Sequence, residues 1–365
     1  MKQARYSRYG GPDVVEVTDA PTPVAAPGEV VIRVRAATVG AADAAARAGS
    51  PAFARLYFGL RHPRIPVLGS DVAGEIVSVG DAGGSAGGAG GGSAGGSAGG
   101  SAAGAGVASG AGDARFRVGD RVFGVTGSTM GGHATHVVLP TDGALALQPS
   151  GVTDAESAAL VDATALAFLR DAGRLHSGQR LLVIGASGSV GSMAVQLGVH
   201  FGAHVTGVCS GPNVELVRSL GAERVVDYTR EDWWAAPVGD DPHPDARYDV
   251  IFDAVGASSY RRARPMLADG GVYLRTVPTL AILLQMAWTS LTSRLHLGRT
   301  RAAIAFTGLR PTSAQAGDLA VTVELVEAGA LRAVIDSTYP LERIADAHRR
   351  VDTHRKRGAV IVTME

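Results

Sequence analysis

Three evenly spaced glycines stand where an apolar run of the sequence gives way to a helical pattern. Gly185, Gly188 and Gly191 follow the run 180–184 and lead into small and apolar residues, in the stretch LLVIGASGSVGSMAVQL. A helix that begins without side chains offers its amide hydrogens and the positive end of its dipole to an anion. The pattern G-x-x-G-x-x-G after a strand therefore predicts a seat for the diphosphate of a dinucleotide. A glycine turn that only packs a helix against a sheet is the alternative.

The strand that follows indicates which dinucleotide to expect. The stretch HVTGVCSG ends about 20 residues beyond the glycines, where an NAD-dependent protein places an acid on the ribose diol. No carboxylate stands there, so NADPH is expected in preference to NADH. The ends of the later strands should line the same site. Arg218 is a further candidate, and its alternative is an exposed helix residue paired with a nearby acid. The predicted cofactor contacts are Gly185, Ser187, Gly188, Ser189, Val190, Gly191, Ser210, Asn213, Arg218, Tyr228, Val255, Gly256, Thr276 and Val277.

The elements that position these residues fall into three stretches. Residues 1–152 contain short β-branched runs such as EVVIRVRAATV, which predict a small, mostly β unit. Residues 153–308 begin with a helical pattern, DAESAALVDATALAFLRDAG, and then alternate strands with helices, as in a parallel, doubly wound sheet. Residues 309–365 hold two helices and two strands that can return to the first unit. The expected fold class is α/β.

One segment interrupts this pattern. From about 82 to 112 the chain is almost wholly glycine, alanine and serine, which cannot bury enough apolar surface to offset the entropy of ordering. A disordered surface loop between two strands is expected, since closure entropy grows slowly with loop length. Its glycines lack the flanking strand and helix that a nucleotide-binding loop requires.

Composition limits the partners of the chain. The 365 residues are 46% hydrophobic, which is enough for two domains, and 34 basic residues balance 34 acidic ones, so no net charge attracts nucleic acid or an anionic membrane. The single cysteine, Cys209, excludes an internal disulfide and a thiolate-rich zinc site. No apolar run reaches the roughly 20 residues of a membrane span, and no signal core opens the chain, so a cytoplasmic protein is expected.

Several stretches together resemble the medium-chain dehydrogenase/reductase superfamily, in its zinc-independent, quinone-oxidoreductase-like branch. They are RIPVLGSDVAGEIVSVG, RFRVGDRVFG, GASGSVGSMAVQL, HVTGVCSGPNVELVRSLGAERVVDYTRED, YDVIFDAVG and RGAVIVTME. The resemblance covers nearly the whole chain except the Gly/Ala/Ser segment. It implies a GroES-like catalytic domain built from the N-terminal part and the C-terminal tail, a Rossmann domain between them, NADPH, and substrate in an interdomain cleft.

The chain departs from the zinc-dependent relatives of this family at their metal site. Those relatives carry a cysteine in the region of ATVGAADAAARAG and a histidine–glutamate pair where this chain has Ser70 and Asp71. They also carry a four-cysteine lobe, whereas no cysteine precedes Cys209 here. No catalytic zinc is therefore expected. Reduction of a quinone, an enone or a related activated carbonyl compound is favoured, because it needs only hydride and a proton donor or oxyanion stabiliser.

Two residues are candidate catalytic groups. Asp43 lies in a loop that resembles the cleft-lining segment of the family and is expected to orient the nicotinamide or relay a proton, with capping of the helix AADAAARAG as the alternative. Thr164 resembles the threonine that the family turns toward the nicotinamide carboxamide, and its alternative is a bond to its own helix backbone. Quinone reductases commonly show Asn-Pro-x-Asp where this chain has residues 40–43, GAAD, so an amide near the nicotinamide is missing.

These inferences predict an NADPH-dependent reductase of quinones or enones that uses no metal, binds no nucleic acid and spans no membrane. A protein of another class remains open: an NADPH-binding sensor or assembly protein with little turnover, which the missing amide motivates. The apolar segment 279–291 follows the fifth strand of the dinucleotide-binding domain, where either a substrate wall or the contact of a homodimer is expected.

Overall fold

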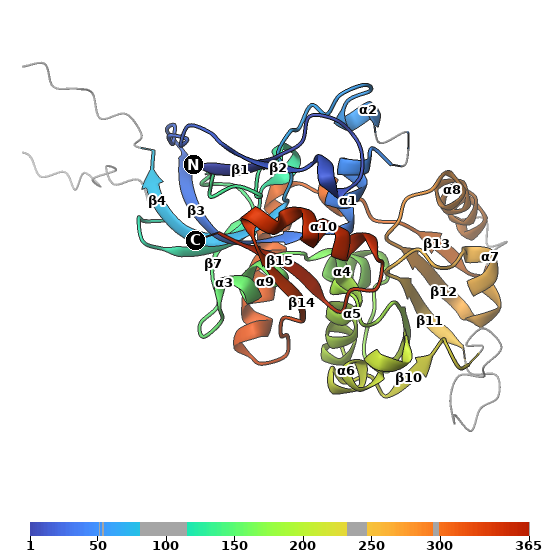
Figure 1. The fold of residues 1–365 in the computed structure, drawn as a ribbon. Coiled ribbons are helices and arrows are strands. Elements are labelled where there is room, and N and C mark those ends of the chain that lie inside the picture. Colours follow the sequence, from blue (N-terminus) through green and yellow to red (C-terminus); the bar gives the residue numbers. More distant parts are fainter. Residues whose placement is uncertain (51, 53–54, 81–114, 232–246, 295–298, 365) are drawn as a thin grey trace, which may run out of the picture.

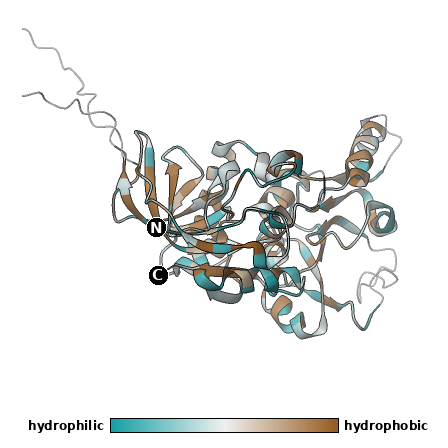
Figure 2. Cartoon of the chain, turned by 45° about the horizontal axis from the view of Figure 1, so that its top comes forward, coloured by the Kyte–Doolittle hydropathy of each residue, from teal (hydrophilic) through white to brown (hydrophobic). Residues whose placement is uncertain are grey.

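The computed structural model describes residues 1–50, 52, 55–80, 115–231, 247–294 and 299–364, and the Gly/Ala/Ser segment lies outside them. The described residues form two large β-sheets, with helices packed around them, and a separate two-stranded sheet (Figure 1). The strands of both large sheets are mainly hydrophobic (Figure 2). The α/β fold class is confirmed.

The first large sheet combines strands from both ends of the chain, in the order β14-β15-β3-β4-β5-β7, with β6 paired to β3. Antiparallel pairing of β15 with β3 places Val360 opposite Val39, so the last strand completes a sheet begun by the first ones. The red C-terminal strands of Figure 1 accordingly lie beside the blue ones. The strands are β3 (Glu29–Val39), β4 (Asp71–Val79), β5 (Arg121–Val125), β6 (His136–Pro140), β7 (Leu145–Leu147), β14 (Ile335–Pro340) and β15 (Ala359–Thr363); β1 (Lys2–Arg5) and β2 (Glu16–Asp19) form the separate pair.

The second large sheet is parallel throughout and has the order β10-β9-β8-β11-β12-β13. The strand order reverses between β8 and β11, and sheets of this kind bind ligands outside the carboxyl ends of the strands at such a point. The first strand, β8, ends at Ile184, directly before the three glycines. The strands are β8 (Arg180–Ile184), β9 (His204–Cys209), β10 (Arg224–Asp227), β11 (Tyr248–Asp253), β12 (Leu267–Arg275) and β13 (Arg301–Ala303).

Helices cover both sheets and connect their strands. None of those in the described ranges combines the length and apolar character of a bilayer span. The α-helices are α1 (Ala41–Ala48), α2 (Arg55–Phe58), α3 (Asp154–Leu160), α4 (Thr164–Leu166), α5 (Ser189–His200), α6 (Val214–Ser219), α7 (Tyr260–Ala263), α8 (Leu280–Arg294), α9 (Thr312–Glu327) and α10 (Ile344–Asp352).

The helical stretch predicted over 153–172 is broken in the middle. Helix α3 ends at Leu160, α4 begins at Thr164, and a π-helical turn, η4 (Ala167–Ala172), follows. The Asp162 carboxylate accepts a hydrogen bond from the Thr164 amide at 3.0 Å. An aspartate that accepts a backbone amide two residues further on competes with helix continuation, so the break falls between Leu160 and Thr164.

Helix α8 carries an apolar face that no described residue covers. Leu280, Leu284 and Trp288 are 72%, 63% and 67% exposed and recur every fourth residue, which places them on one side of the helix. The opposite side packs inward through Ile282, which is buried. Figure 1 shows α8 at the end of the molecule beyond β12 and β13.

His348 of α10 is a polar residue in the core of the first domain. Its side chain is fully buried, and neither ring nitrogen has a hydrogen-bond partner among the residues described. The ring lies edge-on to that of His133, with 6.0 Å between the centroids. Burial, and to a smaller extent His133 and Arg47, lowers the pKa of His348 to about 2. The imidazole is therefore neutral in the folded protein.

Replacing His348 by Leu is expected to make the protein lose less stability as the pH falls. Only the unfolded chain takes up this proton as the pH falls below 6.5, the ordinary value of the imidazole. For each pH unit below this value, the wild-type protein should lose up to about 1.4 kcal/mol of unfolding free energy. The variant H348L should not show this loss. Urea unfolding at a series of pH values between about 7 and 5 measures the difference. The exposed His176 offers a matched control, H176L, and equal pH slopes for all three proteins would contradict the assignment.

Candidate functional site

The three glycines form a tight loop between β8 and α5. Gly185 adopts a φ of +79°, which side chains rarely tolerate, and its amide donates to the Val208 carbonyl at 3.0 Å. A Cβ on Gly191 would lie 2.1 Å from the Gly185 carbonyl oxygen. The first turn of α5 can therefore pack on the end of β8 only because both residues lack side chains.

Gly188 has a less crowded environment than Gly185 and Gly191. A Cβ added there would meet only the Gly185 carbonyl oxygen, at 3.4 Å. Gly188 is the N-cap of the twelve-residue helix α5 and, as a glycine, has no side chain to cap the amides of the first turn. A helix start with free amides and room in front of it fits a phosphate group. The loop thus has the features that the sequence analysis associates with a diphosphate seat, which stays a prediction.

The C-terminal return of the chain contacts the same loop. Gly358 donates from its amide to the Ser187 carbonyl at 2.8 Å and forms an isolated parallel bridge with Gly188. Lys356, two residues earlier, donates from Nζ to the Gly358 carbonyl at 3.0 Å. Burial lowers the pKa of this ammonium group, against the opposing effect of Asp162. Sequence reasoning did not single out Lys356, because nothing local marks a C-terminal lysine as a neighbour of residues 187–188.

At the end of β9 the predicted ribose contacts are arranged around local hydrogen bonds. Asn213 donates from Nδ2 to the Ser210 hydroxyl at 3.1 Å. Arg218 forms an ion pair with Glu215, three residues earlier on α6, which is the alternative given for it. Tyr228 is 55% exposed, and its amide donates to the Cys209 carbonyl at 3.1 Å. The ends of β9 and β10 thus bring Ser210, Asn213 and Tyr228 together. Arg218 instead pairs with Glu215 on α6.

Asp227 is an acid near this position that the sequence analysis missed. Parallel pairing of β10 with β9 sets Asp227 beside Cys209, the last residue of β9. Its carboxylate accepts the Thr229 hydroxyl at 2.7 Å and the Thr229 amide at 3.0 Å, and the backbone of Gly211 also donates to it. These bonds hold the pKa of Asp227 below its usual value. The carboxylate thus organises the turn after β9.

The ends of β11 and β12 bring the remaining predicted contacts together. Val255 and Val277 are 52% and 41% exposed and lie over Gly185 and Gly256 respectively. The Thr276 hydroxyl donates to the Ala254 carbonyl at 3.1 Å. Parallel register of β8, β11 and β12 aligns all these strand ends at one edge of the sheet.

Buried Asp253 holds the loop that follows β11. Its carboxylate accepts the Ser258 amide and the Tyr273 hydroxyl, each at 2.8 Å. Arg275 donates to the Gly256 carbonyl at 2.9 Å from the neighbouring strand. The loop is therefore fixed by its own domain and does not depend on a bound ligand for its shape.

Asp43 occupies the capping position that was its alternative interpretation. The side chain is only 1% exposed, and its two oxygens accept the Gly40 amide at 2.8 Å and the Gly69 amide at 3.0 Å. The carboxylate starts α1 and ties it to the turn before β4. Both oxygens are engaged with backbone, so a direct contact of Asp43 with a nicotinamide has no support in this geometry.

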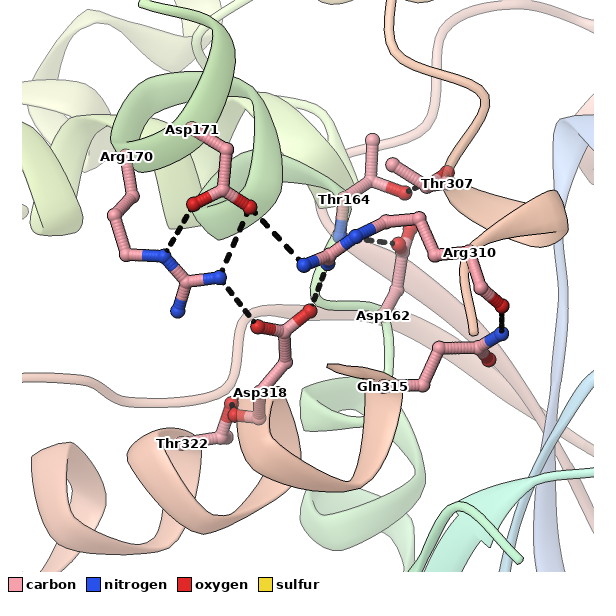
Figure 3. A network of polar contacts seen from close by, with 9 residues as sticks. All are labelled: Asp162, Thr164, Arg170, Asp171, Thr307, Arg310, Gln315, Asp318 and Thr322. Carbon is pink, nitrogen blue, oxygen red and sulfur yellow. Dashed lines mark hydrogen bonds and ion pairs between the residues drawn. The ribbon is translucent and has the colours of Figure 1, made fainter. Parts of the chain in front are cut away.

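Thr164 lies where three parts of the chain meet (Figure 3). Its hydroxyl is 3.2 Å from that of Thr307, in the segment after β13, and its amide is bonded to Asp162. The alternative, a hydroxyl bonded to its own helix, is not what the structure shows. The Thr164 hydroxyl therefore links the start of α4 to the segment that follows β13.

A network of charged side chains around the buried Asp318 lies beside Thr164 and joins η4 to α9. Asp318 is 2% exposed and accepts hydrogen bonds from Arg170, at 2.8 Å, and from Arg310 (Figure 3). Both arginines also bind Asp171. A buried carboxylate with two guanidinium partners has its charge compensated, and loss of one partner would be costly. The network sets the relative position of the segments that carry Thr164 and Thr307.

Among the described residues, no group of three or more His, Cys, Asp or Glu side chains is arranged to hold a metal ion. Ser70 and Asp71 stand at the position where the sequence comparison with zinc-dependent enzymes placed a ligand pair. The Asp71 carboxylate instead accepts a hydrogen bond from the Thr38 hydroxyl at 2.7 Å.

Comparisons with known proteins agree with this architecture. The family model described as alcohol dehydrogenase GroES-like domain matches residues 26–149, and the one described as zinc-binding dehydrogenase matches residues 220–362. The chain is 28% identical to the chloroplast envelope quinone oxidoreductase homolog of Arabidopsis thaliana, over 99% of this chain and 98% of that protein. It is 27% identical to the mitochondrial NAD(P)H oxidoreductase RTN4IP1 of Bos taurus, over 93% and 82%.

Solved structures share the fold over the whole chain. The quinone oxidoreductase from Coxiella burnetii superposes with a TM-score of 0.77 at 22% identity, covering 100% of this chain and 99% of that one. This likeness shows the fold, and the two matched family models and the full-length relatives carry the family. The chain belongs to the medium-chain dehydrogenase/reductase superfamily, in its quinone-oxidoreductase-like branch.

Proposed function

We propose that the protein is an NADPH-dependent oxidoreductase that transfers hydride to a quinone, an enone or a related activated carbonyl compound without zinc. The observation that carries the proposal is the open N-terminus of α5, which has free amides at the switch point of a parallel sheet and Thr164 at the adjoining domain junction. Oxidoreductase activity with a nicotinamide coenzyme is supported by the family itself.

The coenzyme choice rests on the end of β9. No carboxylate follows Cys209 in the chain, and the nearby Asp227 is engaged with Thr229 and the Gly211 backbone. A ribose diol thus finds no free acid to bind there, which favours the 2′-phosphate of NADPH. Ser210 and Asn213 offer neutral polar groups at this position.

The acceptor class rests on the chemistry of the junction. Ser70 and Asp71 replace the metal ligands of the zinc-dependent branch, so no Lewis acid is proposed to polarise a simple carbonyl. Conjugated acceptors are reduced by hydride with one accompanying proton, and the nicotinamide supplies the hydride when it is bound. The chain's part is to seat the diphosphate on α5, to present the Thr164 hydroxyl to the ring, and to place Val255 and Val277 as apolar contacts.

Replacing Gly188 by Ala is expected to weaken coenzyme binding without harming the fold. The new methyl group has room in the free protein but occupies the seat of the diphosphate. Loss of hydrogen bonds to a charged group costs about 1.5–3 kcal/mol, so Kd for NADPH should rise by about tenfold to a hundredfold. Calorimetric titration measures the Kd, and a melting curve measures the stability of the fold. The control is G317A in α9, where a Cβ also meets open space; equal affinity of G188A and G317A would refute the seat.

Coenzyme oxidation over a panel of quinones and enones tests the reaction. NADPH is expected to be consumed faster than NADH with at least one acceptor, and a metal chelator should leave the rate unchanged. Saturable NADPH binding with no oxidation for any acceptor would instead favour the sensor or assembly protein. A rate that is lost with chelator and restored by zinc would contradict the zinc-free mechanism.

A homodimer and a cytoplasmic location also remain predictions. The exposed face of α8 next to the edge strand β13 supports self-association, whereas the names of the curated relatives point to plastids and mitochondria. Sedimentation velocity is expected to show a dimer for the wild-type protein and a shift toward monomer for W288S. A monomeric wild-type protein would contradict the dimer.

A further inference from the structure

We propose that a pocket beside β3 binds a small organic anion, whose carboxylate or phosphate head is held by Arg33 and Arg35. The pocket lies outside the coenzyme seat, so the inference does not depend on the proposed function. Three observations carry it: a cavity with an excess of basic side chains, a guanidinium group that makes no hydrogen bond, and a shielded nitrogen that lacks an acceptor.

The pocket lies where two strands share one edge of β3. Strand β6 pairs with residues 29–33 of β3 and β15 pairs with residues 36–39, while β4 occupies the opposite edge. A pocket of about 370 Å³ lies at the position between the two strands. Both ends of the chain border it, through Lys2 and Met364 (Figure 1). Only the folded chain therefore assembles this pocket.

The size of the pocket suits a small molecule. Ligand pockets in proteins measure about 300–1,000 Å³, so a volume of about 370 Å³ is at the lower end of that range. Val34, Leu341 and Met364 contribute apolar atoms to its lining. A ligand with a charged head and a small apolar body matches both features.

Basic side chains outnumber acidic ones around the pocket. Lys2, Arg33 and Arg35 line it. Among the described residues that line it, the one acid is Glu342, which pairs with Lys2 at 2.7 Å. Glu75 of β4 lies opposite Arg33 and pairs with its guanidinium group at 2.6 Å. Two acids thus compensate two bases, and one positive charge remains.

The remaining positive charge belongs to Arg35. Its guanidinium group makes no hydrogen bond within the described part of the chain, and the Glu75 oxygen at 3.9 Å is already bonded to Arg33. The side chain is 38% exposed, so its donors are accessible. A guanidinium group presents a planar fork that binds a carboxylate or a phosphate through two parallel hydrogen bonds. An oxyanion can therefore bind Arg35 without breaking the pair of Arg33 with Glu75.

Arg33 contributes a donor that solvent does not reach. Its Nε is buried and has no acceptor among the residues described, although the side chain as a whole is 40% exposed. A buried N–H group without a partner is costly. The guanidinium groups of Arg33 and Arg35 approach the same Glu75 oxygen, so they lie next to each other. In the proposed complex the oxyanion supplies the acceptor that Nε lacks.

A second hollow of the same volume also borders Arg35 but has no excess of positive charge. Its other charged residues are Glu75, Arg121 and Asp154. Arg121 pairs with Asp154 at 3.1 Å, so bases and acids are equal in number there. The charge balance therefore assigns the anion to the pocket between β6 and β15.

Strand β15 separates this pocket from the coenzyme seat. It begins directly after Gly358, which is bonded to Ser187 of the glycine loop, and it ends at Thr363, which lines the pocket. At about 3.3 Å per residue, the two sites are roughly 15 Å apart. An anion in the pocket therefore leaves the diphosphate position free.

Titration with defined anions tests the pocket. Phenyl phosphate and benzoate present the two head groups on the same apolar ring, and benzamide is the neutral match. At constant ionic strength, calorimetry should show saturable binding of at least one anion and none of benzamide. Binding of benzamide as tight as that of the anions, or no saturation by either anion below about 10 mM, would overturn the proposal.

Replacing Arg35 by Gln tests the residue. The variant R35Q should raise the Kd of the anion at least tenfold, because it loses the charge and the fork of donors. The matched control is R117Q, which removes an exposed arginine of the same domain that does not line the pocket. Equal affinity of R35Q and R117Q would contradict the site.

The variant G188A separates the pocket from the glycine loop. The anion should bind G188A and the wild-type protein equally, and R35Q should keep the wild-type Kd for NADPH. Anion binding that is lost in G188A and kept in R35Q would place the anion on the loop and refute the pocket. Failure of NADPH to bind any of these proteins would instead contradict the proposed function alone.

Chemical modification of the wild-type protein gives a measurement that needs no variant. Phenylglyoxal reacts with accessible guanidinium groups, and peptide mass spectrometry reports each arginine separately. A saturating anion should protect Arg35 and leave Arg117 reactive. Equal modification of Arg35 with and without the anion would overturn the proposal, even if R35Q fails to fold.

Discussion

The close approach of two backbone segments at the end of β8 underlies the whole site. The first turn of α5 can lie against the Gly185 carbonyl only because Gly191 has no side chain, and this contact aims the free amides of α5 at the space in front of Gly188. The Ser187 carbonyl is bonded in turn to Gly358 of the C-terminal return. One loop therefore joins the parallel sheet, the helix and the other domain, so its shape and the domain arrangement depend on each other.

Ion pairs between Asp318 and two arginines hold η4 against α9. Asp318 is buried between Arg170 and Arg310, and the two guanidinium groups are shared with Asp171 (Figure 3). Such a network is a modest source of net stability, but the buried Asp318 requires its arginine partners, because an unpaired buried charge is costly. Its effect here is geometric: it fixes η4 against α9, and with them the segments that carry Thr164 and Thr307.

The acids of this protein differ in the groups that they bind: several organise backbone, and one accepts hydroxyl groups instead. Asp43, Asp227 and Asp253 each accept at least one backbone amide, and Asp43 and Asp253 are almost wholly buried. Asp71 accepts hydrogen bonds from hydroxyl groups, from Thr38 at 2.7 Å and from Ser70, and faces another carboxylate. Backbone amides stabilise the charged form of an acid, whereas burial beside a like charge stabilises the protonated form. Its neighbours thus decide whether an aspartate side chain favours its charged or its protonated form.

The sequence by itself determined what depends on local pattern. The alternating strands and helices, the glycine loop at a strand end, and the family all follow from periodicity and from residues close together in the chain. Only the tertiary structure decided what depends on distant neighbours. Asp227 comes beside the end of β9 through parallel strand register, and Lys356 reaches the glycine loop through the return of the chain. The break at Asp162 and its effect on Asp71 depend on contacts between domains. The charge state of a buried acid is set by all the groups around it, and the order of residues in the chain does not contain that arrangement.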